Sequence, residues 1–410
     1  MKTKTHSSLL FIMIVLISTF PVANADSQMW SVQILDVNSA YLNGGLIAID
    51  SKSDPHIVYS VYNENYPETN ILYKSWNGSA WKVETVIIGG IAVDFVLDSK
   101  NTPHILYKDT NTGVGLKYAT FTGVNWSSQI VDVKGFEGSL ALDSIEKPHV
   151  AYTDGRDLKY AILTDLNWSI QTLKTAGNIF GPCLAFDSNN KPYILYVEGA
   201  YESTEAIRYA VWNENGSWNY QTVVNNARIG HLSLGTDGYP HFTYFEQVHI
   251  GNNTLAKLAY KSCHGATWET QIIASDIEPG SRGGNFILDQ QNDPHICYFV
   301  PSTSSARQGD LIYAKLVDNI WNIQTITNSN ATGPGTIAVD TQGNPHISYP
   351  GPVNGNYLPT YLMYTTVTPL DQATNSRMPA VISWTIAIIA VIIVIAIIIY
   401  AQKRKRKITF

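Results

Sequence analysis

The fold is decided by the segment Asp50-Ser-Lys-Ser-Asp-Pro55-His56-Ile-Val-Tyr59, because close copies of it return along the chain. Its proline has seven copies, at Pro55, Pro103, Pro148, Pro192, Pro240, Pro294 and Pro345. A tyrosine follows each proline four places later, at Tyr59, Tyr107, Tyr152, Tyr196, Tyr244, Tyr298 and Tyr349. Each unit also carries a later tyrosine, at Tyr73, Tyr118, Tyr160, Tyr209, Tyr260, Tyr313 and Tyr364, and a tryptophan, at Trp30, Trp81, Trp126, Trp168, Trp218, Trp268 and Trp321. This self-similarity predicts an array of seven structural repeats.

Each repeat has the pattern of four short β-strands. In one unit, residues 139–143, 149–153, 158–163 and 168–173 form alternating or apolar runs, and turn residues separate them. Such runs, with Gly, Asn, Asp or Pro between them, are typical of antiparallel strands in a meander. Four strands in a unit of about 40 to 50 residues are the signature of a propeller blade. The sequence therefore predicts an all-β fold, a single seven-bladed β-propeller.

The two ends of the repeat array complete one another. Trp30 is a fourth-strand marker with no blade before it, and the segment around 361–367 is a third strand with no tryptophan strand after it. We expect residues 30–35 to pair with this last third strand, because a closed ring leaves no exposed sheet edge. Deletion of residues 26–36 is then expected to destabilise the entire ring.

Residues 1–25 have the pattern of a secretory signal peptide. Two lysines precede an apolar stretch from Leu9 to about Phe20, and Ala23-Asn24-Ala25 is a small-x-small cleavage pattern. The apolar stretch is shorter than the roughly 20 residues that a bilayer-crossing helix needs. We expect cleavage before Asp26 and export of the chain that follows.

Residues 379–400 predict a single transmembrane helix, because they contain no charged residue and are rich in Ile, Val and Ala. The basic run at 403–407 follows, and basic flanks stay on the cytoplasmic side. These features place the protein in the cell membrane with its propeller outside. The expected order is a signal peptide (1–25), a propeller ectodomain (26–368), a linker (369–378), a transmembrane helix (379–400) and a basic cytoplasmic tail (401–410).

The charge distribution argues against nucleic acid as a partner. All 33 acidic residues lie between Asp26 and Met378, where 20 of the 27 basic residues oppose them and leave a net charge of −13. Such a surface repels polyanions and admits cations or basic partners. A nucleic-acid patch at 403–407 is the alternative, but a basic run beside a span already has a topological role.

The fold must rely on ordinary burial, because at most one disulfide can form among Cys183, Cys263 and Cys297.

The Asp-x4-Pro-His-Ile-x-Tyr repeats resemble those of bacterial and archaeal cell-surface β-propellers, which are loosely grouped with sialidase-type propellers. The resemblance covers nearly all of residues 29–368. It departs from the sialidase pattern, because the chain has no Ser-x-Asp-x-Gly-x-x-Trp box and no Arg-Ile-Pro segment. The chain also lacks, as repeated features, the Gly-His and Trp-Asp signatures of WD40 blades and the paired glycines of kelch blades. The resemblance implies the fold and carries no activity with it.

Six histidines occupy the position after the repeated proline, and the fourth blade has Tyr193 there. Metal ligation is one hypothesis, but equivalent positions on neighbouring blades lie about 10 Å apart, whereas zinc needs its ligands about 2 Å from one centre. We therefore predict no metal and no cofactor. Each imidazole is expected to pack and to bond the backbone or a carboxylate of a neighbouring blade. The six are His56, His104, His149, His241, His295 and His346.

A repeated aspartate ends the first strand of six blades. Because a tight turn follows it, its side chain is expected to accept hydrogen bonds from the amides of that turn. A catalytic carboxylate pair is the alternative, but acid–base catalysis needs two specifically placed groups and not six copies of one. We find no set of nucleophile, base and oxyanion donors and predict no catalytic residue. The copies are Asp50, Asp98, Asp143, Asp187, Asp289 and Asp340, with Gly235 in the fifth blade.

Acidic residues at one strand position are confined to four consecutive blades. The position lies two residues after the second-strand tyrosine, and it is acidic in the second to fifth blades. The other three blades carry Val61, Val300 and Gly351 there. We expect the acids to form an arc that binds a cation or a basic ligand. The alternative is a set of solvated strand ends that only adds to the acidic surface. The four acids are Asp109, Asp154, Glu198 and Glu246.

The links between strands define two faces of the predicted propeller. The outer face carries the links between blades and between second and third strands; the short-turn face carries the other two turns. Second-to-third links vary most, and variable loops on a rigid scaffold usually carry recognition. The last third strand ends on the short-turn face, so the linker leaves there and the outer face points away from the cell.

Six sequons predict glycosylation, and the first four fall in third-to-fourth-strand turns of successive blades. Glycans there would coat the short-turn face. The alternative is that Asn and Gly are simply good turn residues. The sequons are at Asn77, Asn125, Asn167, Asn215, Asn252 and Asn330.

These features predict a membrane-anchored extracellular propeller that acts as a ligand-binding or protein-interaction module at the cell surface. Its ligand is expected to be a protein, a glycan or a cation. The alternative is a glycan-directed hydrolase or lyase on the same fold. Two carboxylates and an arginine or tyrosine converging in a pocket at the outer mouth would favour the enzyme.

Overall fold

A computed structural model describes residues 30–367, with gaps at 37–44, 63–68, 114, 200–204, 214, 251–252, 266, 303–304 and 354–355. The predicted signal peptide, linker, transmembrane helix and cytoplasmic tail lie outside the described residues and stay predictions. Within the described part, no helix is both long enough and apolar enough to cross a membrane. All regular elements there are β-strands, which confirms the predicted all-β class.

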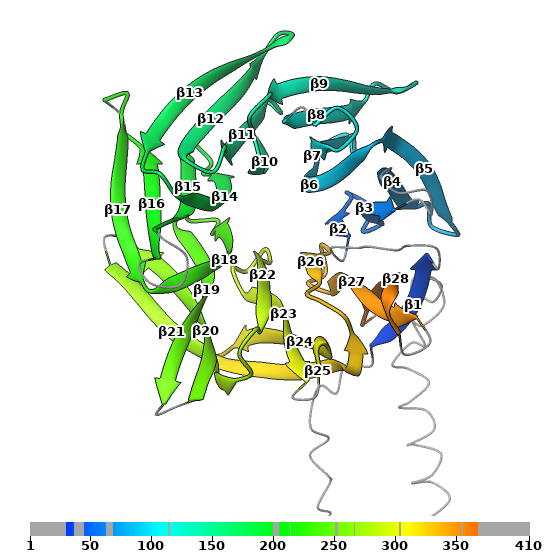
Figure 1. The fold of residues 1–410 in the computed structure, drawn as a ribbon, viewed down its shortest axis with the longest axis vertical. Coiled ribbons are helices and arrows are strands. Elements are labelled where there is room, and N and C mark those ends of the chain that lie inside the picture. Colours follow the sequence, from blue (N-terminus) through cyan, green and yellow to red (C-terminus); the bar gives the residue numbers. More distant parts are fainter. Residues whose placement is uncertain are drawn as a thin grey trace, which may run out of the picture.

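The strands form seven four-stranded antiparallel sheets arranged around a central axis (Figure 1). The first blade contains β2 (Leu46–Ile49), β3 (Pro55–Tyr62), β4 (Thr69–Trp76) and β5 (Trp81–Ile88). The second contains β6 (Gly90–Leu97), β7 (Pro103–Asp109), β8 (Leu116–Phe121) and β9 (Trp126–Asp132). The third contains β10 (Glu137–Leu142), β11 (Pro148–Thr153), β12 (Asp157–Thr164) and β13 (Asn167–Thr175).

The remaining blades continue the same order from the inside of the ring outward. The fourth contains β14 (Ile179–Phe186), β15 (Pro192–Glu198), β16 (Ala206–Trp212) and β17 (Trp218–Asn225). The fifth contains β18 (Ala227–Leu234), β19 (Pro240–Ile250), β20 (Asn253–His264) and β21 (Thr267–Ile277). The sixth contains β22 (Arg282–Leu288), β23 (Pro294–Ser302), β24 (Ser305–Val317) and β25 (Ile320–Ala331). The seventh contains β26 (Thr336–Val339), β27 (Pro345–Val353), β28 (Asn356–Thr366) and β1 (Ser31–Asp36).

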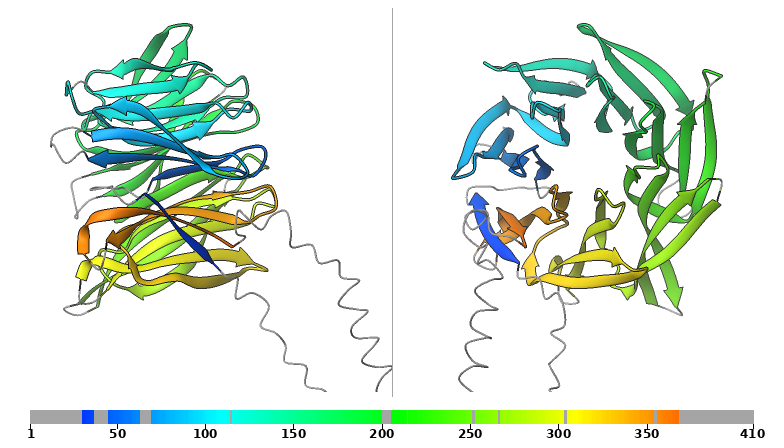
Figure 2. Two further views of the ribbon diagram at one scale, coloured as in Figure 1. Left: turned by 90° about the vertical axis from the view of Figure 1, so that its right-hand side faces the viewer. Right: turned by 180° about the vertical axis from the view of Figure 1, so that it is seen from behind.

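The seventh blade is built from both ends of the propeller. β1 pairs antiparallel with β28, with Ser31 opposite Thr366, and Figure 2 shows the two strands side by side in both views. The indole of Trp30 donates a 3.0 Å hydrogen bond to Gln324 of the sixth blade. The predicted closure by residues 30–35 is therefore confirmed. Thr366 also lies opposite His346, so β28 ends on the short-turn face.

The apolar core lies between neighbouring blades. One cluster, for example, joins Val58 and Ile71 of the first blade to Ile105 and Tyr107 of the second. At every junction, the repeated tryptophan packs edge-on against the later repeated tyrosine of the preceding blade, with ring centroids 5.1–5.8 Å apart. Such a pair adds about 0.5–1.5 kcal/mol beyond the burial of its surface. The same contact therefore holds all seven junctions, including the one that Trp30 makes with Tyr313.

Candidate functional site

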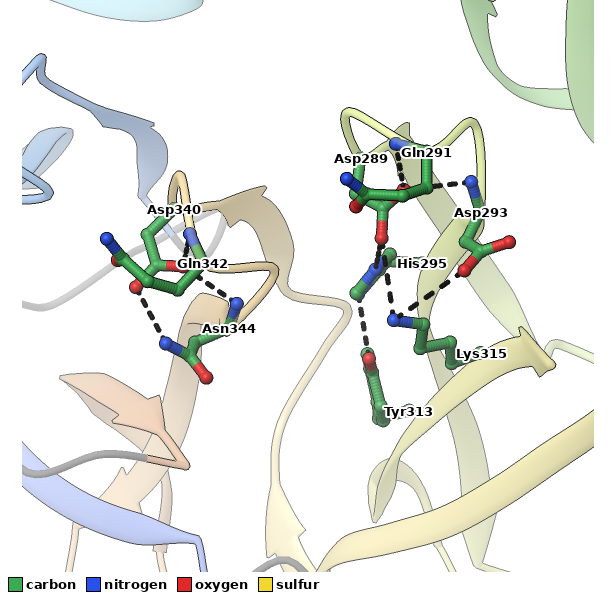
Figure 3. A network of polar contacts seen from close by, with 9 residues as sticks. All are labelled: Asp289, Gln291, Asp293, His295, Tyr313, Lys315, Asp340, Gln342 and Asn344. Atoms are coloured by element: carbon green, nitrogen blue, oxygen red, sulfur yellow. Dashed lines mark hydrogen bonds and ion pairs between the residues drawn. The ribbon is translucent and has the colours of Figure 1, made fainter.

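A chain of three polar side chains repeats on the short-turn face, and Figure 3 shows it in the sixth blade. Asp289 Oδ1 accepts hydrogen bonds of 2.9 Å from the backbone amides of Gln291 and Asp293. Its Oδ2 lies 3.1 Å from Nε2 of His295, and Nδ1 of that ring lies 2.8 Å from the hydroxyl of Tyr313. If Nε2–H donates to the carboxylate, the neutral ring accepts the hydroxyl proton at Nδ1.

The same Asp–His–Tyr chain recurs in four other blades. Nε2 of the histidine bonds Oδ2 of the aspartate at 3.3 Å in the third blade. In the first, second and seventh blades the two atoms lie 3.5–3.6 Å apart, and Nε2 makes no hydrogen bond there. The prediction that a neighbouring blade supplies the partner of the imidazole was wrong, because one tight turn joins the aspartate and the histidine of the same blade. The prediction for the aspartates is confirmed, since Oδ1 of all six accepts the amides two and four residues later, at 2.6–3.0 Å.

The Asp–His–Tyr chain has the wrong environment for catalysis. In the sixth blade, His295 is 0 % and Tyr313 is 2 % exposed, so no substrate can reach either group. Burial is the main cause that lowers the pKa of His295 to about 4 and that raises the pKa of Tyr313 above its usual range. The histidine is therefore neutral and the tyrosine protonated at neutral pH, and the chain serves to position the turn against the third strand.

Two blades depart from this chain. In the fourth blade, Tyr193 replaces the histidine and its hydroxyl donates a 3.2 Å hydrogen bond to Asp187. In the fifth blade, Gly235 replaces the aspartate. His241 still contacts the hydroxyl of Tyr260 through Nδ1, but its Nε2 has no hydrogen-bond partner among the described residues.

The acids of the predicted arc lie near the outer-face ends of their second strands, and the structure pairs each with a basic side chain. Asp109 is paired with Lys117. Asp154 lies 3.0 Å from Lys159. Burial raises the pKa of Asp154, but the amide of Asp157 and the ammonium of Lys159 lower it further, to about 2.

The other two acids are paired in the same way. Glu198 lies 2.7 Å from Lys174 and 3.3 Å from Arg208, and Glu246 is paired with Lys257. Lys174 comes from β13 of the third blade, whereas Arg208 and Lys257 come from the strand adjacent to the acid in its own blade. The arc is therefore largely neutralised by its paired cations, and a cationic ligand would have to displace a lysine or arginine to bind. The binding role of the arc stays a prediction.

The innermost strands line a central channel of about 690 Å³. In every blade, one residue of the first strand lines this channel. It lies three residues before the residue that pairs with the repeated proline. In six blades it is a polar residue or a cysteine. That position holds Leu46, Asp94, Ser139, Cys183, His231, Asn285 and Thr336. The sequence argument missed this set, because no two of its polar members share a residue type. Aligning the seven units on their prolines would have revealed it.

Polar groups of this channel bond the backbone of the next blade. Asp94 accepts a 2.7 Å bond from the amide of Leu140, and Asn285 and Thr336 donate 2.6 Å bonds to carbonyls of the following blades. Burial raises the pKa of Asp94 to about 6, whereas His231 is exposed where it lines the channel. Asp94 is the one carboxylate in the described lining, which includes no arginine. The channel therefore lacks the carboxylate pair of a typical glycosidase.

The sequons lie in exposed turns and strand ends where the structure describes them. Asn77, Asn125, Asn167, Asn215 and Asn330 are exposed, and Asn252 lies outside the described residues. Oδ1 of Asn77 accepts the amides of Ser79 and Ala80 at 3.0 and 2.9 Å, as expected of a turn asparagine. Glycosylation stays a prediction at all six positions.

The described residues offer neither a metal site nor a disulfide. No three or more His, Cys, Asp and Glu side chains are grouped there to hold a metal ion. The three cysteines are free thiols. Burial raises the pKa of Cys183 and of Cys297 to about 12, so neither is a reactive thiolate at neutral pH.

No protein-family model and no curated protein sequence matches the chain, but solved structures match its fold. A PL25 ulvan lyase bound to -[GlcA(1-4)Rha3S]- is 11 % identical with a TM-score of 0.60, and the match covers 84 % of this chain and all of that one. A puromycin-hydrolyzing peptidase of Mycobacterium tuberculosis is 10 % identical, with a TM-score of 0.52 over 80 % of this chain and 52 % of that one. A fungal alcohol oxidase of the AA5 family, in complex with copper, is 8 % identical, with a TM-score of 0.51 over 82 % of this chain and 76 % of that one. These likenesses support the fold alone, and the chain is a seven-bladed β-propeller.

Proposed function

We propose that the chain is a membrane-anchored extracellular propeller that binds a protein or glycan on its outer face without catalysing a reaction. The observation that carries the proposal is the unequal height of that face. In the fifth to seventh blades, the second and third strands are 9–13 residues long. In the second to fourth blades, they are 6–8 residues long.

The long second-to-third-strand hairpins of the fifth to seventh blades form a raised wall on the outer face. The shorter hairpins of the second to fourth blades form the lower part of that face. Because β19 continues to Ile250 and β20 begins at Asn253, this hairpin extends past Glu246, whereas the second strand of the second blade ends at Asp109. A scaffold needs no such difference, since all blades share the same core contacts. Recognition does, because loops of unequal length on a rigid frame shape a ligand-specific surface.

The membrane anchor is supported by the direction in which the chain leaves the propeller. β28 ends on the short-turn face, and the uncharged segment 379–400 and basic run 403–407 follow. A bilayer on that side leaves the outer face accessible from the outside. Protease protection of the tail in intact cells, with cleavage of the ectodomain, tests this topology.

The binding proposal is tested with the full chain in detergent on a glycan array and against extracellular proteins. Replacement of residues 248–255 by the two-residue turn Asn-Gly, which connects the opposed residues Gln247 and Ala256, shortens the wall. We expect loss of at least tenfold in affinity for any ligand found. The double variant Asp154→Asn, Glu198→Gln tests the acidic arc separately. Unchanged affinity in the shortened variant would contradict binding at the wall, and unchanged affinity in the double variant would contradict the arc.

The alternative is a glycan-directed hydrolase or lyase acting at the channel. One observation favours it: the channel is lined by Asp94, with a pKa near 6, and by His231. The pKa of Asp94 suits proton transfer near neutral pH. A panel of polysaccharides decides between the two. Turnover that disappears in Asp94→Asn or His231→Gln would replace the binding proposal, and binding without turnover would support it.

A further inference from the structure

The turns of the short-turn face carry the most exposed large apolar side chains of the described part of the chain. Four such side chains lie in these turns, each 67–79 % exposed. The next most exposed, Ile88 at 63 %, lies on the outer face. Single exposed apolar residues are normal on a protein surface, but four that share one face point to a common contact. We call them the apolar tips: Val124, Ile145, Leu166 and Ile320.

The geometry of these turns does not require apolar side chains. Val124 and Leu166 each lie two residues before the repeated tryptophan, between the third and fourth strands of their blades. The left-handed conformations there belong to their neighbours Gly123 and Asp165, with φ of 91° and 55°. The first blade forms the same turn with Ser79 at this position, a residue type that turns favour. The apolar tips therefore need an explanation other than turn formation.

The proposed anchor brings a bilayer to this face. β28 ends on the short-turn face, and twelve residues, 367–378, separate it from the uncharged segment 379–400. A chain of that length spans at most about 40 Å. With the anchor in place, the membrane stays within reach of the turns. A tethered contact of this kind needs little affinity of its own, because the tether keeps the effective concentration of the lipid surface high.

The apolar tips lie where they would stop the propeller from tilting on its tether. The chain leaves from the seventh blade, whereas three of the four tips belong to the second and third blades. Figure 1 shows the third blade (β10–β13) across the ring from the seventh (β26–β28 and β1). Attachment at one side of the ring and apolar contact at the other would hold the short-turn face parallel to the bilayer.

Charge contributes little attraction in the turns of the second and third blades. Apart from the aspartates that cap the turns, Lys100 and Lys147 are opposed there by Glu146 and Asp165. The capping aspartates add negative charge, so these turns are not a basic patch that anionic lipid would attract. Apolar side chains can still be buried at the boundary between headgroups and acyl chains. We therefore expect contact with zwitterionic lipid.

We propose that the short-turn face rests on the bilayer that anchors the chain, with Val124, Ile145 and Leu166 inserted at the headgroup level. This inference rests on the proposed membrane anchor. It excludes glycans at Asn125 and Asn167, because each of these sequon residues directly follows an apolar tip and a glycan there would hold the tip away from the lipid. The contact would present the outer face and its raised wall to the outside in one fixed orientation.

The experiment reconstitutes the full chain into phosphatidylcholine vesicles and attaches an environment-sensitive fluorophore to one introduced cysteine. Leu166→Cys places it at an apolar tip. Val133→Cys is the matched control, because Val133 is an apolar residue of the outer face that is 59 % exposed. We expect phosphatidylcholine with a nitroxide near its headgroup to quench the fluorophore about threefold more strongly at position 166 than at position 133. The wild-type chain, treated with the same reagent, corrects for labelling of native thiols.

A second variant tests whether the other tips hold the face on the lipid. The changes Val124→Asp and Ile145→Asp replace exposed side chains, so the labelled chain should remain folded. Quenching at position 166 is expected to fall to the level of the control. Quenching that stays as strong as before would contradict insertion of these tips.

Alkaline carbonate extraction of the same vesicles separates this contact from the anchor. If the chain stays in the membrane and position 166 is quenched no more than position 133, the anchor stands and the contact is overturned. If carbonate extracts the chain, both are overturned. Disulfide-linked dimers of Leu166→Cys without quenching would assign the face to a second copy of the chain, against the proposal. Mass spectrometry of the chain from its native membrane adds an independent check, because glycans at Asn125 or Asn167 would also contradict the contact.

Discussion

The fifth and sixth blades bury the same His–Tyr pair, but only the sixth supplies the acid behind it. His241 and His295 each contact the hydroxyl of a third-strand tyrosine through Nδ1, and burial lowers the pKa of both to about 4. Asp289 binds Nε2 of His295, whereas Nε2 of His241 has no hydrogen-bond partner among the described residues. The difference shows that strand pairing and the tyrosine position the histidine even without the carboxylate. The carboxylate serves the turn, and in the fifth blade Oδ1 of Asp237 accepts the turn amide of Tyr239 at 3.1 Å instead.

The largest expected difference between the two blades appears when each histidine is removed. His295→Ala removes a hydrogen bond from Asp289 and one from Tyr313, but Lys315 still lies 3.4 Å from Oδ2 of Asp289, so we expect a loss of about 2–4 kcal/mol. His241→Ala leaves only the hydroxyl of Tyr260 unpaired, for about 1–3 kcal/mol. Chemical unfolding monitored by circular dichroism measures both. Equal losses would mean that the Asp289 contact contributes little.

Acidification is expected to weaken both blades by a similar amount. The unfolded chain protonates a histidine near pH 6.5, whereas His241 and His295 take the proton only near pH 4. Their stabilisation is therefore complete above about pH 6.5 and falls as the pH drops toward about 4, by up to about 3 kcal/mol each. Unfolding at pH 7.5 and pH 4.5 should show a smaller pH effect in His241→Gln and in His295→Gln than in the wild type. A pH effect that survives in both variants would assign it to other groups.

The sequence allowed the fold to be predicted almost completely, because its markers repeat once per blade. Pro55 and Tyr59 and their copies fixed the strand register, and Trp30 fixed the closure of the ring. Because the same markers recur in all seven units, the similarity between the units is not a coincidence. The role of the repeated aspartate was predictable for the same reason, since the turn that it caps is local.

The contacts across strands and blades were not predictable in this way. The pairing of Asp109 with Lys117 depends on the register of β7 against β8, which joins residues that no motif connects. Hydrogen bonds in the channel, such as that of Asp94 with Leu140, join residues of two blades and differ chemically from one junction to the next. The substitution at Gly235 was visible in the sequence. Its consequence for His241 required the positions of the surrounding atoms.

Restoring the acid of the fifth blade should stabilise the propeller. In the variant Gly235→Asp, Asp237→Asn, the new carboxylate can accept the turn amides and bond Nε2 of His241, and each such bond contributes about 1 kcal/mol net. Replacement of Gly235 also reduces the entropy of the unfolded chain. We expect the free energy of unfolding to rise by about 1–2 kcal/mol. A decrease would show that the restored side chain does not fit the turn.

The smallest expected effect concerns the turn residue that joins the two blades. Asn292 has a φ of 65°, in the left-handed region, and Gly238 occupies the same turn position of the fifth blade with a φ of 79°. Asn292→Gly keeps the backbone conformation and removes only the two bonds to Thr236, which are exposed and should cost about 0.5–1 kcal/mol. Asn292→Ala loses the same bonds and adds about 1 kcal/mol of backbone strain. Chemical unfolding of both variants therefore separates the two contributions. If the variants are equally stable, the asparagine serves the blade junction alone and the turn imposes no strain on alanine.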